Sequence, residues 1–524
     1  MTDTAWPSHS TPDLLERLKE TTVLTTATGG RQIIVEAPAT GDVVASLPSC
    51  TVDDLQQAVG RARAAQQRWA AVPLAERRRI FLRYHDLILR EQELLLDLLQ
   101  LETGKARRHA LEELLDVAIV SRYYALRLKR YLKPKRRRGA LPLLTKTIEY
   151  HHPVGVVGII SPWNYPLSLA VSDGLPALMA GNAVILKPDS QTPFTALLAV
   201  RLLEQAGLPP DLFQVVTGSG TELGGTLINN SDFLCFTGST ATGRVVAARA
   251  GQCLIKCSLE LGGKNPALVL DDADIERTVE GLVRGCFSNA GQLCVSFERL
   301  YVQSGIYDRF MAAFLQRVTS LKLGHRYDYE PEIGSLISSM QLAAVELQLK
   351  DALDKGAVLL AGGRHRPDIG PYFFEPTVLT GVTEAMTLCR EETFGPVVSV
   401  YRFDQVEEAV RLANDTGYGL NAAVWTRNRR RGEALARTIQ CGTVNVNEAY
   451  AAAWASLDAP MGGMKGSGVS RRHGSEGMLK YTESQTVATQ RLLPIAPLPG
   501  MSGGLYARIM TVALQFMRHL PGLG

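Results

Sequence analysis

The spacing of hydrophobic residues divides the chain into a helical first part and a longer part of mixed character. Residues 52–130 predict helices, because apolar side chains such as Phe81, Tyr84 and Ile88 recur every three or four positions. From residue 154 the pattern changes, and the continuous apolar run at residues 154–160 is typical of a buried strand. The chain is therefore expected to begin with helices and to continue with strands covered on both faces.

Short apolar runs then alternate with helix-like stretches over most of the chain. Strands are predicted at residues 183–186, 213–216 and 233–236 in a first series, and at 266–270, 399–403 and 444–447 in a second. This alternation predicts an α/β fold with two doubly wound parallel sheets, and a length of 524 residues suits two or more domains. Such sheets bind ligands beyond the carboxyl ends of their strands, so we expect the chemistry in a cleft between the domains.

The last thirty residues have a separate pattern. A Pro-rich linker at residues 493–500 precedes a predicted amphipathic helix. Its apolar face consists of Leu505, Ile509, Val512, Phe516 and Leu520. Three alternatives stay open for this helix: it packs on its own oligomer, it lies on a membrane surface, or it covers the substrate entrance.

Composition and charge narrow the function without defining it. A net charge of +4 is too small for a chain of this length to indicate nucleic-acid binding. Basic residues gather at 127–138, which predicts a solvated helix end and loop, with an anionic membrane-surface patch as the alternative.

The cysteines and the termini point to a reducing compartment. The eight cysteines form no CxxC pair and the nine histidines are scattered, which predicts free thiols and no metal site. The first residues lack the apolar core of a signal peptide, and no run of about 18 apolar residues occurs. We therefore expect a cytoplasmic protein without a membrane span.

Two glycine-bearing segments carry a candidate nucleophile and a candidate base. Glu260 lies in Leu-Glu-Leu-Gly-Gly-Lys-Asn-Pro, and Cys294 ends Asn-Ala-Gly-Gln-Leu-Cys. A thiolate can add to a carbonyl carbon, and a carboxylate can activate the water that releases the product. Buried cysteines more often serve packing, as we expect for Cys286.

Two further motifs follow predicted strands, and a third precedes one. Gly238, Ser239 and Gly243 lie at a turn into a helix, where unpaired backbone N–H groups can bind a pyrophosphate. A nearby segment, Gly-Ser-Gly-Thr-Glu-Leu-Gly at residues 218–224, misses the GxGxxG fingerprint by one position. The other two motifs are Ser-Pro-Trp-Asn-Tyr-Pro at residues 161–166 and Glu-Glu-Thr-Phe-Gly-Pro-Val at residues 391–397.

In this order, the motifs resemble those of the aldehyde dehydrogenase superfamily over about residues 30–490. The resemblance implies that Cys294 is the nucleophile, that Glu260 is the base, and that Asn164 donates to the oxyanion. The reaction would be the NAD(P)+-dependent oxidation of an aldehyde to a carboxylic acid through a cysteine thioester. For Asn164 the alternative is a cap on the following helix. For the whole chain it is a noncatalytic binding or structural protein on the same fold.

The resemblance also implies the cofactor site. Its residues are Trp163, Lys187, Ser190, Gly238, Ser239, Gly243, Leu261, Glu392 and Phe394. Many NAD-preferring members carry a Glu where this chain has Ser190. A carboxylate there would repel a 2′-phosphate, whereas a hydroxyl near Lys187 suits one. We therefore expect NADP, with NAD as the alternative.

The stretch Lys-Pro-Asp-Ser-Gln-Thr-Pro-Phe-Thr-Ala at residues 187–196 resembles that of NADP-linked bacterial succinic semialdehyde dehydrogenases. Residues 171–173, 286–289 and 459–464 further resemble a second, actinobacterial branch of that group. Succinic semialdehyde, oxidised to succinate, is therefore the expected substrate. The two arginines that hold the substrate carboxylate in that group correspond to Ser172 and Ser288 here, and Ser456 resembles a substrate-loop serine. A serine does not replace a bidentate arginine, so medium- or long-chain aliphatic aldehydes are the alternative.

The resemblance further implies a homodimer or homotetramer built through a protruding β-arm. Residues 145–150 alternate like a strand that residues 481–489 could pair. We expect a cofactor-binding domain formed by residues 1–132 and 154–262, and a catalytic domain formed by residues 263–455. Residues 133–153 and 478–492 would form the oligomerisation arm. Residues 456–477 would form the substrate loop and return segment, and residues 493–524 the Pro-rich linker and C-terminal helix.

Overall fold

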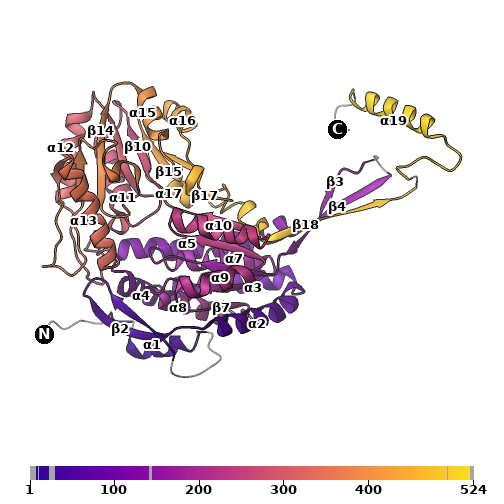
Figure 1. Ribbon diagram of the computed structural model, residues 1–524, viewed down its shortest axis with the longest axis horizontal. Coiled ribbons are helices and arrows are strands. Elements are labelled where there is room, and N and C mark those ends of the chain that lie inside the picture. Colours follow the sequence, from indigo (N-terminus) through magenta and orange to yellow (C-terminus); the bar gives the residue numbers. More distant parts are fainter. Residues whose placement is uncertain (1–6, 10, 23–29, 141–143, 493, 520–524) are drawn as a thin grey trace.

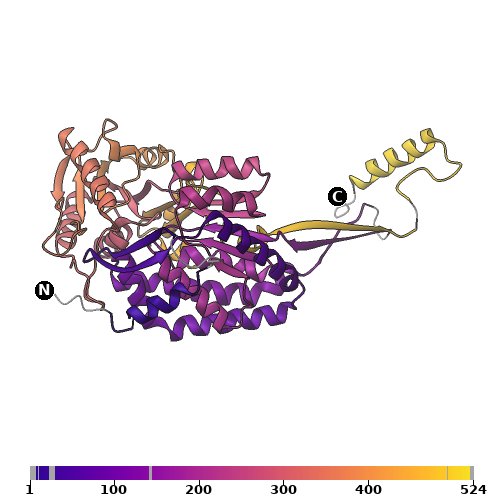
Figure 2. The ribbon, with the colours of Figure 1, turned by 60° about the horizontal axis from the view of Figure 1, so that its bottom comes forward.

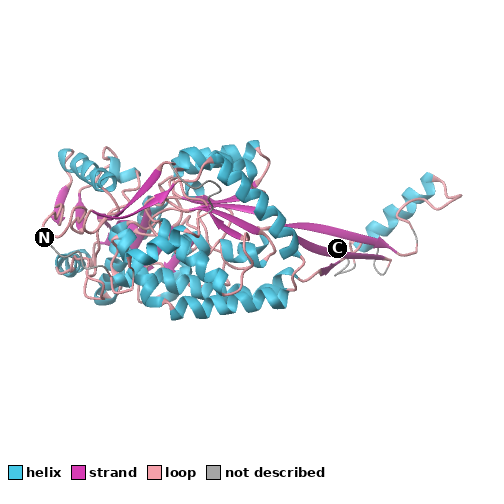
Figure 3. Ribbon diagram, turned by 90° about the horizontal axis from the view of Figure 1, so that it is seen from below, coloured by secondary structure: helices cyan, strands magenta, loops and turns pink. Residues whose placement is uncertain are grey.

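The computed structural model describes residues 7–9, 11–22, 30–140, 144–492 and 494–519. It consists of two packed bodies from which a long arm extends (Figure 1). In a view from below, the strands of the bodies lie between layers of helices, as expected for sheets with two buried faces (Figure 3).

Four helices fill most of the region predicted to be helical. The elements up to residue 132 are α1 (Pro12–Lys19), β1 (Gln32–Ala37), β2 (Asp42–Pro48), α2 (Val52–Ala70), α3 (Leu74–Arg90), α4 (Gln92–Thr103) and α5 (Arg107–Leu132). Helix α2 begins with a capping box, in which Thr51 and Asp54 exchange side-chain to backbone hydrogen bonds. Helix α4 ends at Gly104, whose left-handed φ of 67° turns the chain toward α5 and leaves Lys105 buried in the turn.

The first sheet has six strands in the order β17-β9-β8-β5-β6-β7. Its strands are β5 (Val156–Ile160), β6 (Ala183–Lys187), β7 (Phe213–Val215), β8 (Phe233–Thr237), β9 (Lys256–Glu260) and β17 (Gly468–Val469). Its helices are α6 (Ser168–Val171), α7 (Gly174–Met179), α8 (Pro193–Gln205), α9 (Gly220–Asn230) and α10 (Thr240–Gln252). All neighbouring strands are parallel except β17 and β9. The strand order reverses next to β5, and a ligand is expected beyond the carboxyl ends there.

The second sheet has seven strands in the order β12-β13-β14-β11-β10-β15-β16, with β12 antiparallel at its edge. Its strands are β10 (Asn265–Val269), β11 (Phe297–Gln303), β12 (Val358–Ala361), β13 (Thr377–Thr380), β14 (Val397–Phe403), β15 (Asn421–Trp425) and β16 (Thr443–Val446). Its helices are α11 (Ile275–Phe287), η1 (Ser288–Gly291), α12 (Tyr307–Thr319), α13 (Ser339–Asp354), α14 (Thr387–Arg390), α15 (Val406–Asn414), α16 (Arg429–Ala436) and α17 (Ala451–Trp454). The two predicted parallel sheets are confirmed, and each carries one antiparallel edge strand that the pattern did not reveal.

The arm is a three-stranded antiparallel sheet in the order β18-β4-β3. Strand β18 (Thr482–Gln490) pairs with β4 (Thr145–Pro153) from Thr482 opposite Pro153 to Gln490 opposite Thr145, as the alternation predicts. Strand β3 (Lys135–Arg137) carries part of the basic segment, and the elements η2 (Lys465–Ser467) and α18 (Glu476–Leu479) precede β18.

Helix α19 (Gly503–Met517) lies beyond the arm and has no buried side chain (Figures 1 and 2). It lies away from the body of its own chain and does not cover a substrate entrance there. Leu493 and Leu520, two residues of the predicted linker and apolar face, lie outside the described residues. Among the described residues, no helix is long and apolar enough to cross a membrane.

Candidate active site

The edges of the two sheets bring the predicted site residues together. Strands β5, β6, β8 and β9 of the first sheet end in the segments that carry Asn164, Lys187, Ser239 and Glu260. The second sheet contributes from the opposite ends of its strands, because Cys294 lies just before β11 and Glu392 just before β14. The site is therefore built where the carboxyl edge of one sheet meets the amino edge of the other.

The segment before Cys294 has an unusual backbone that fixes the thiol. Asn289 and Ala290 have left-handed φ values of 52° and 54°, and Gly291 follows with 73°. A Cβ at Gly291 would lie 2.1 Å from the carbonyl oxygen of Gly395, so only glycine fits. The side chain of Asn265 donates to the carbonyl oxygens of Cys294 and Ser296, both at 2.7 Å, and holds the turn in place.

The thiol and the carboxylate of the candidate pair are both electrostatically perturbed. Burial raises the pKa of Cys294 to about 12, and the nearby charges of Glu260 and Glu392 add to the effect. Burial also raises the pKa of Glu260 to about 7, while Arg472 and Lys480 oppose that rise. The Oε1 atom of Glu260 is buried and has no hydrogen-bond partner among the described residues. A carboxylate left unpaired and poised near neutral pH is suited to accept a proton.

Asn164 is buried and points its amide toward the cysteine segment. Its Nδ2 donates to the carbonyl oxygen of Gln292 at 3.1 Å. Helix α6 starts at Ser168 and has no side-chain cap, so the capping alternative for Asn164 is wrong.

The predicted cofactor residues of the first sheet line its carboxyl edge. The buried Nζ of Lys187 donates to the carbonyl oxygens of Pro188 at 2.6 Å and Gly218 at 3.2 Å, and Ser190 donates to Gly218 at 3.2 Å. In the described part of the chain, Lys187 forms no ion pair with a carboxylate. Such a cation, beside a hydroxyl group, fits a ribose that carries a phosphate.

The turn into helix α10 has the geometry of an anion site. Ser239 caps the helix and accepts from the N–H of Thr242 at 3.2 Å. Gly243 lies so close to Leu261 that a Cβ would meet its side chain at 2.4 Å. Leu261 is held by a hydrogen bond from its N–H to Ser467. A Cβ at Gly238 would meet Phe236 at 2.6 Å, so glycine keeps the turn tight at the helix N-terminus.

Glu392 and Phe394 complete the cleft from the second sheet. The Oε1 of Glu392 accepts from the N–H of Gly263 at 2.7 Å, and burial raises the pKa of Glu392 to about 8. Phe394 has a left-handed φ of 52° and meets the ring of Trp163 edge-on, with ring centres 5.5 Å apart. These three predicted cofactor residues are therefore neighbours, although they come from both domains.

Known proteins share both the sequence and the arrangement. The profile of the aldehyde dehydrogenase family matches residues 24–487. This chain belongs to the aldehyde dehydrogenase family. A relative from Mycolicibacterium smegmatis, provisionally named an NADP(+)-dependent succinate-semialdehyde dehydrogenase, is 52% identical over 93% of this chain and 94% of its own length. The mitochondrial succinate-semialdehyde dehydrogenase of Oryza sativa subsp. japonica is 37% identical over 88% of this chain and 87% of its own length.

Solved structures of family members have the same fold. An NADP-dependent enzyme of E. coli superposes with a TM-score of 0.84 at 36% identity, over 88% of this chain and 95% of that chain. Betaine aldehyde dehydrogenase of Staphylococcus aureus, solved with NAD+, gives a TM-score of 0.85 at 32% identity, over 92% and 98% of the two chains. The α/β fold expected from the resemblance is confirmed.

The aldehyde dehydrogenase chain has a cavity of about 150 Å³ beside the cysteine segment. Leu293 and Val295, the neighbours of Cys294, form part of its wall. The rest of the wall comes from α5, the start of α6 and the turn before it, α11, and α17 with its flanking residues. It includes Glu112, Asp116, Tyr165, Arg284, Tyr450 and Trp454. None of these six residues is among the predicted site residues.

The three predicted substrate serines lie outside that wall. Ser172 is buried and donates to Asp116 at 2.7 Å, and Ser288 is buried and shares a hydrogen bond of 2.8 Å with Tyr450. Ser456 is exposed and donates to the carbonyl oxygen of Ala452, one helical turn earlier. Its neighbours Ala455 and Leu457 contact the cavity instead.

Proposed function

We propose that Cys294, Glu260 and Asn164 carry out the aldehyde oxidation of this family member, with NADP+ as the oxidant. The observation that carries the proposal is the unpartnered oxygen of buried Glu260, whose charge acts on the nearby Cys294 thiol. A buried polar atom without a partner costs free energy, and its persistence is typical of a catalytic group.

In the proposed first half-reaction, Glu260 takes the thiol proton and the Cys294 sulfur bonds to the aldehyde carbon. The Asn164 amide and the backbone N–H of Cys294 donate to the resulting oxyanion. When bound, NADP+ supplies a positive charge that favours the thiolate and accepts the hydride that leaves the aldehyde carbon. Glu260 releases the thiol proton to solvent before the second half, in which it removes a proton from water. The water oxygen adds to the thioester carbon, and the bond to sulfur breaks to release the acid and restore the Cys294 thiolate.

We propose NADP+ over NAD+ because Lys187 offers a buried cation and Ser190 offers a hydroxyl at the position where a carboxylate would repel the 2′-phosphate. The test is the ratio of kcat/KM for NADP+ and NAD+, with Ser190→Glu as the matched variant. The variant should shift preference toward NAD+ through repulsion of the 2′-phosphate. A wild-type enzyme with a higher kcat/KM for NAD+ would contradict this part of the proposal.

Succinic semialdehyde is the first candidate substrate, and the names of the relatives support it. Among the lining residues, Arg284 is the cation that a substrate carboxylate could bind. It is 41% exposed and donates to Glu112 at 2.9 Å, with Glu448 at 3.7 Å. A substrate carboxylate therefore competes with Glu112 for the guanidinium.

Uncharged aliphatic aldehydes are a second candidate, favoured by the pairing of charges around the cavity. Asp116 accepts from Ser168, Ser172 and Trp454, and Glu112 accepts from Tyr450 and Arg284. An apolar chain enters without breaking any of these bonds. Comparing kcat/KM for succinic semialdehyde, butanal and octanal decides between the candidates. Butanal has the same chain length as succinic semialdehyde but lacks the carboxylate charge.

We also propose a cytoplasmic homo-oligomer, a dimer or tetramer, assembled through the arm, with a peripheral membrane contact made by α19. The exposed side chains Leu505, Ile509, Val512 and Phe516 support such a contact, and residues 491–524 contain no Asp or Glu. Sedimentation with anionic and zwitterionic vesicles tests the contact. The control is Ile509→Glu, which should lose binding. The alternative is that α19 belongs to the oligomer interface. In that case the intact chain should not bind vesicles, and a truncation after Gln490 should change the oligomeric state.

A further inference from the structure

A buried ion pair lies behind the turn that carries Asn164. Lys105, in the turn between α4 and α5, pairs with Glu113 on α5, and both side chains are 0% exposed. Placing two charges in the interior is unfavourable unless further hydrogen bonds compensate it. The partners of this pair therefore indicate what it does.

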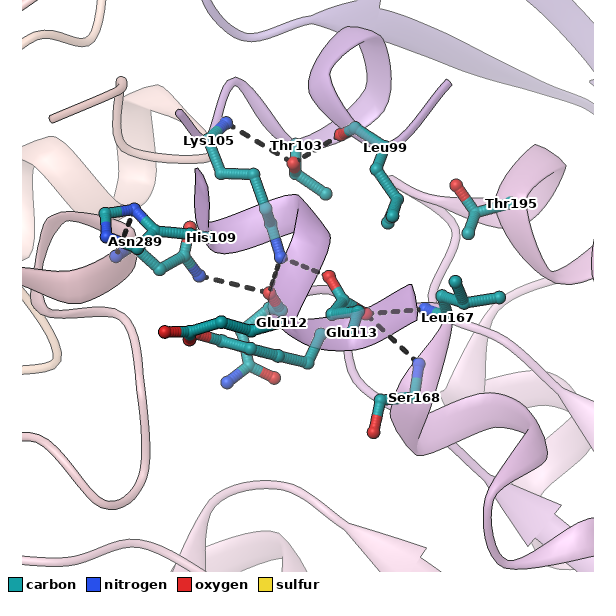
Figure 4. Close-up of polar contacts among 12 residues, drawn as sticks. Leu99, Thr103, Lys105, His109, Glu112, Glu113, Leu167, Ser168, Thr195 and Asn289 are labelled. Atoms are coloured by element: carbon teal, nitrogen blue, oxygen red, sulfur yellow. Dashed lines mark hydrogen bonds and ion pairs between the residues drawn. The ribbon is translucent and has the colours of Figure 1, made fainter. Parts of the chain in front are cut away.

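The two charges hold the same turn from its two ends. The Nζ of Lys105 donates to the carbonyl oxygen of Asn164 at 2.7 Å. The Oε2 of Glu113 accepts from the N–H groups of Leu167 at 2.8 Å and Ser168 at 3.1 Å (Figure 4). The turn from Asn164 to Ser168 is thus bound by a cation at its first carbonyl and by an anion at its last amides.

The same carbonyl also connects the turn to the cysteine segment. The Nδ2 of Asn289 donates to the Asn164 oxygen at 3.0 Å and to the Gln292 oxygen at 3.1 Å. The Gln292 oxygen in turn accepts from the Asn164 amide, and the N–H of Asn289 donates to Nδ1 of His109 at 3.1 Å. A carbonyl oxygen has two lone pairs, so Lys105 and Asn289 together occupy the acceptor capacity of Asn164 and fix its peptide plane.

We propose that Lys105 and Glu113 are positioning residues that set the direction of the Asn164 amide toward the oxyanion. This inference rests on the proposed role of Asn164. With the Lys105 bond removed, the backbone peptide of Asn164 can rotate. The side-chain amide of Asn164 then loses its alignment with the oxyanion. A misplacement of about 1 Å in such a donor costs on the order of a hundredfold in rate.

The first test is Lys105→Met, with kcat, the rate of the first-turnover NADPH burst and Tm measured together. We expect kcat and the burst rate to fall about ten- to a hundredfold, because the oxyanion forms before the hydride leaves. The Kd of NADP+ should change less than twofold, since Lys105 does not contact the proposed cofactor residues. Tm should also fall, because Glu113 is left buried without its cation.

The double variant Lys105→Met with Glu113→Gln separates positioning from stability. The glutamine that replaces Glu113 is uncharged and its oxygen can still accept from the turn amides, so Tm should recover most of the loss. The burst rate should remain low, because the Asn164 carbonyl still lacks the Lys105 donor. Recovery of both Tm and the burst rate would overturn the proposal.

A second buried ion pair on the same helix provides the matched control. Arg107 bonds to Asp97 at 2.7 Å and to Gln100 at 2.8 Å, on the side of α5 that faces α4. Arg107→Met with Asp97→Asn should lower Tm and leave the burst rate within about twofold. An equal loss of burst rate in this control would mean that damage to α5 alone explains the effect.

Asn164→Ala completes a double-mutant cycle. Lys105→Met should add less than about twofold to the loss caused by Asn164→Ala, because both act through one amide. Full additivity would contradict a positioning role. If Asn164→Ala by itself keeps the wild-type burst rate, the proposed function of Asn164 fails, and that result is distinct from a failure of the Lys105 inference alone.

Discussion

The proposed catalytic centre and the cavity beside it differ in how their polar groups are paired. At the centre, Glu260 keeps a buried oxygen without a partner and Cys294 has a strongly perturbed thiol. In the cavity wall, Glu112 and Asp116 are each bound by several donors. Unpaired polar atoms are available for chemistry, whereas paired ones only shape a surface.

This contrast separates what determines the reaction from what determines the substrate. The centre requires a few side chains at fixed positions, and these recur in short motifs. The cavity depends on how three helices pack and on which charges neutralise one another. Changes at the centre should therefore alter the rate for every aldehyde, and changes in the wall should alter the ranking of aldehydes.

The largest effect is expected from removal of the thiol. Cys294→Ala should lower kcat on the order of 10⁴-fold or more for every aldehyde, because no covalent intermediate can form. Mass spectrometry after mixing with aldehyde and NADP+ should show no acylated protein. Cys286→Ala is the matched control, since Cys286 is buried in the core around the second sheet, and it should keep the burst. A residual NADPH burst in Cys294→Ala would show that Cys294 is not the nucleophile.

The next effect separates the two half-reactions. Glu260→Gln should slow thioester hydrolysis by about 10²- to 10⁴-fold, because the general base for water is lost. A burst of NADPH should persist at a reduced rate, since thiol deprotonation then depends on solvent. A variant that loses the burst while hydrolysing the acyl-enzyme at the normal rate would reverse these assignments.

A smaller effect should follow from the cations that face Glu260. Its raised pKa of about 7 predicts that kcat rises with pH through about 7, because only the charged carboxylate accepts a proton. Arg472 and Lys480 favour the charged form, while Asp173 opposes it. Arg472→Met should therefore move the midpoint to higher pH, with kcat at pH 6 falling about tenfold for each unit of rise. Arg472→Lys should keep the midpoint, and an unshifted profile in Arg472→Met would contradict this account.

The residues of the proposed centre stand out in the sequence because they lie in short motifs, of which the one that carries Asn164 follows a predicted strand. Their catalytic roles stay predictions. The two parallel sheets and the pairing of the arm strands are confirmed. The antiparallel strand β17 was missed, since two residues carry no periodic signal. The domain boundaries stay predictions.

The cavity was not predictable, because its wall depends on tertiary packing. Glu112 and Asp116 have the residue type of an exposed helix face, and only the packing of α5 against α6 and α17 brings them inside. Ser456 was chosen for its resemblance, yet its hydroxyl is bonded to its own helix. Lys105 gave no signal, since one lysine after a glycine is common at a helix end.

The smallest effect should come from the charge at the cavity wall, and it tests the comparison most closely. Arg284→Met should lower kcat/KM for succinic semialdehyde about three- to tenfold, a modest range because Arg284 is partly exposed and already paired. For butanal the change should stay within twofold, since no charge is involved. If Arg284→Met changes kcat/KM equally for succinic semialdehyde and butanal, Arg284 does not bind the substrate carboxylate. The uncharged aldehydes then become the better candidates.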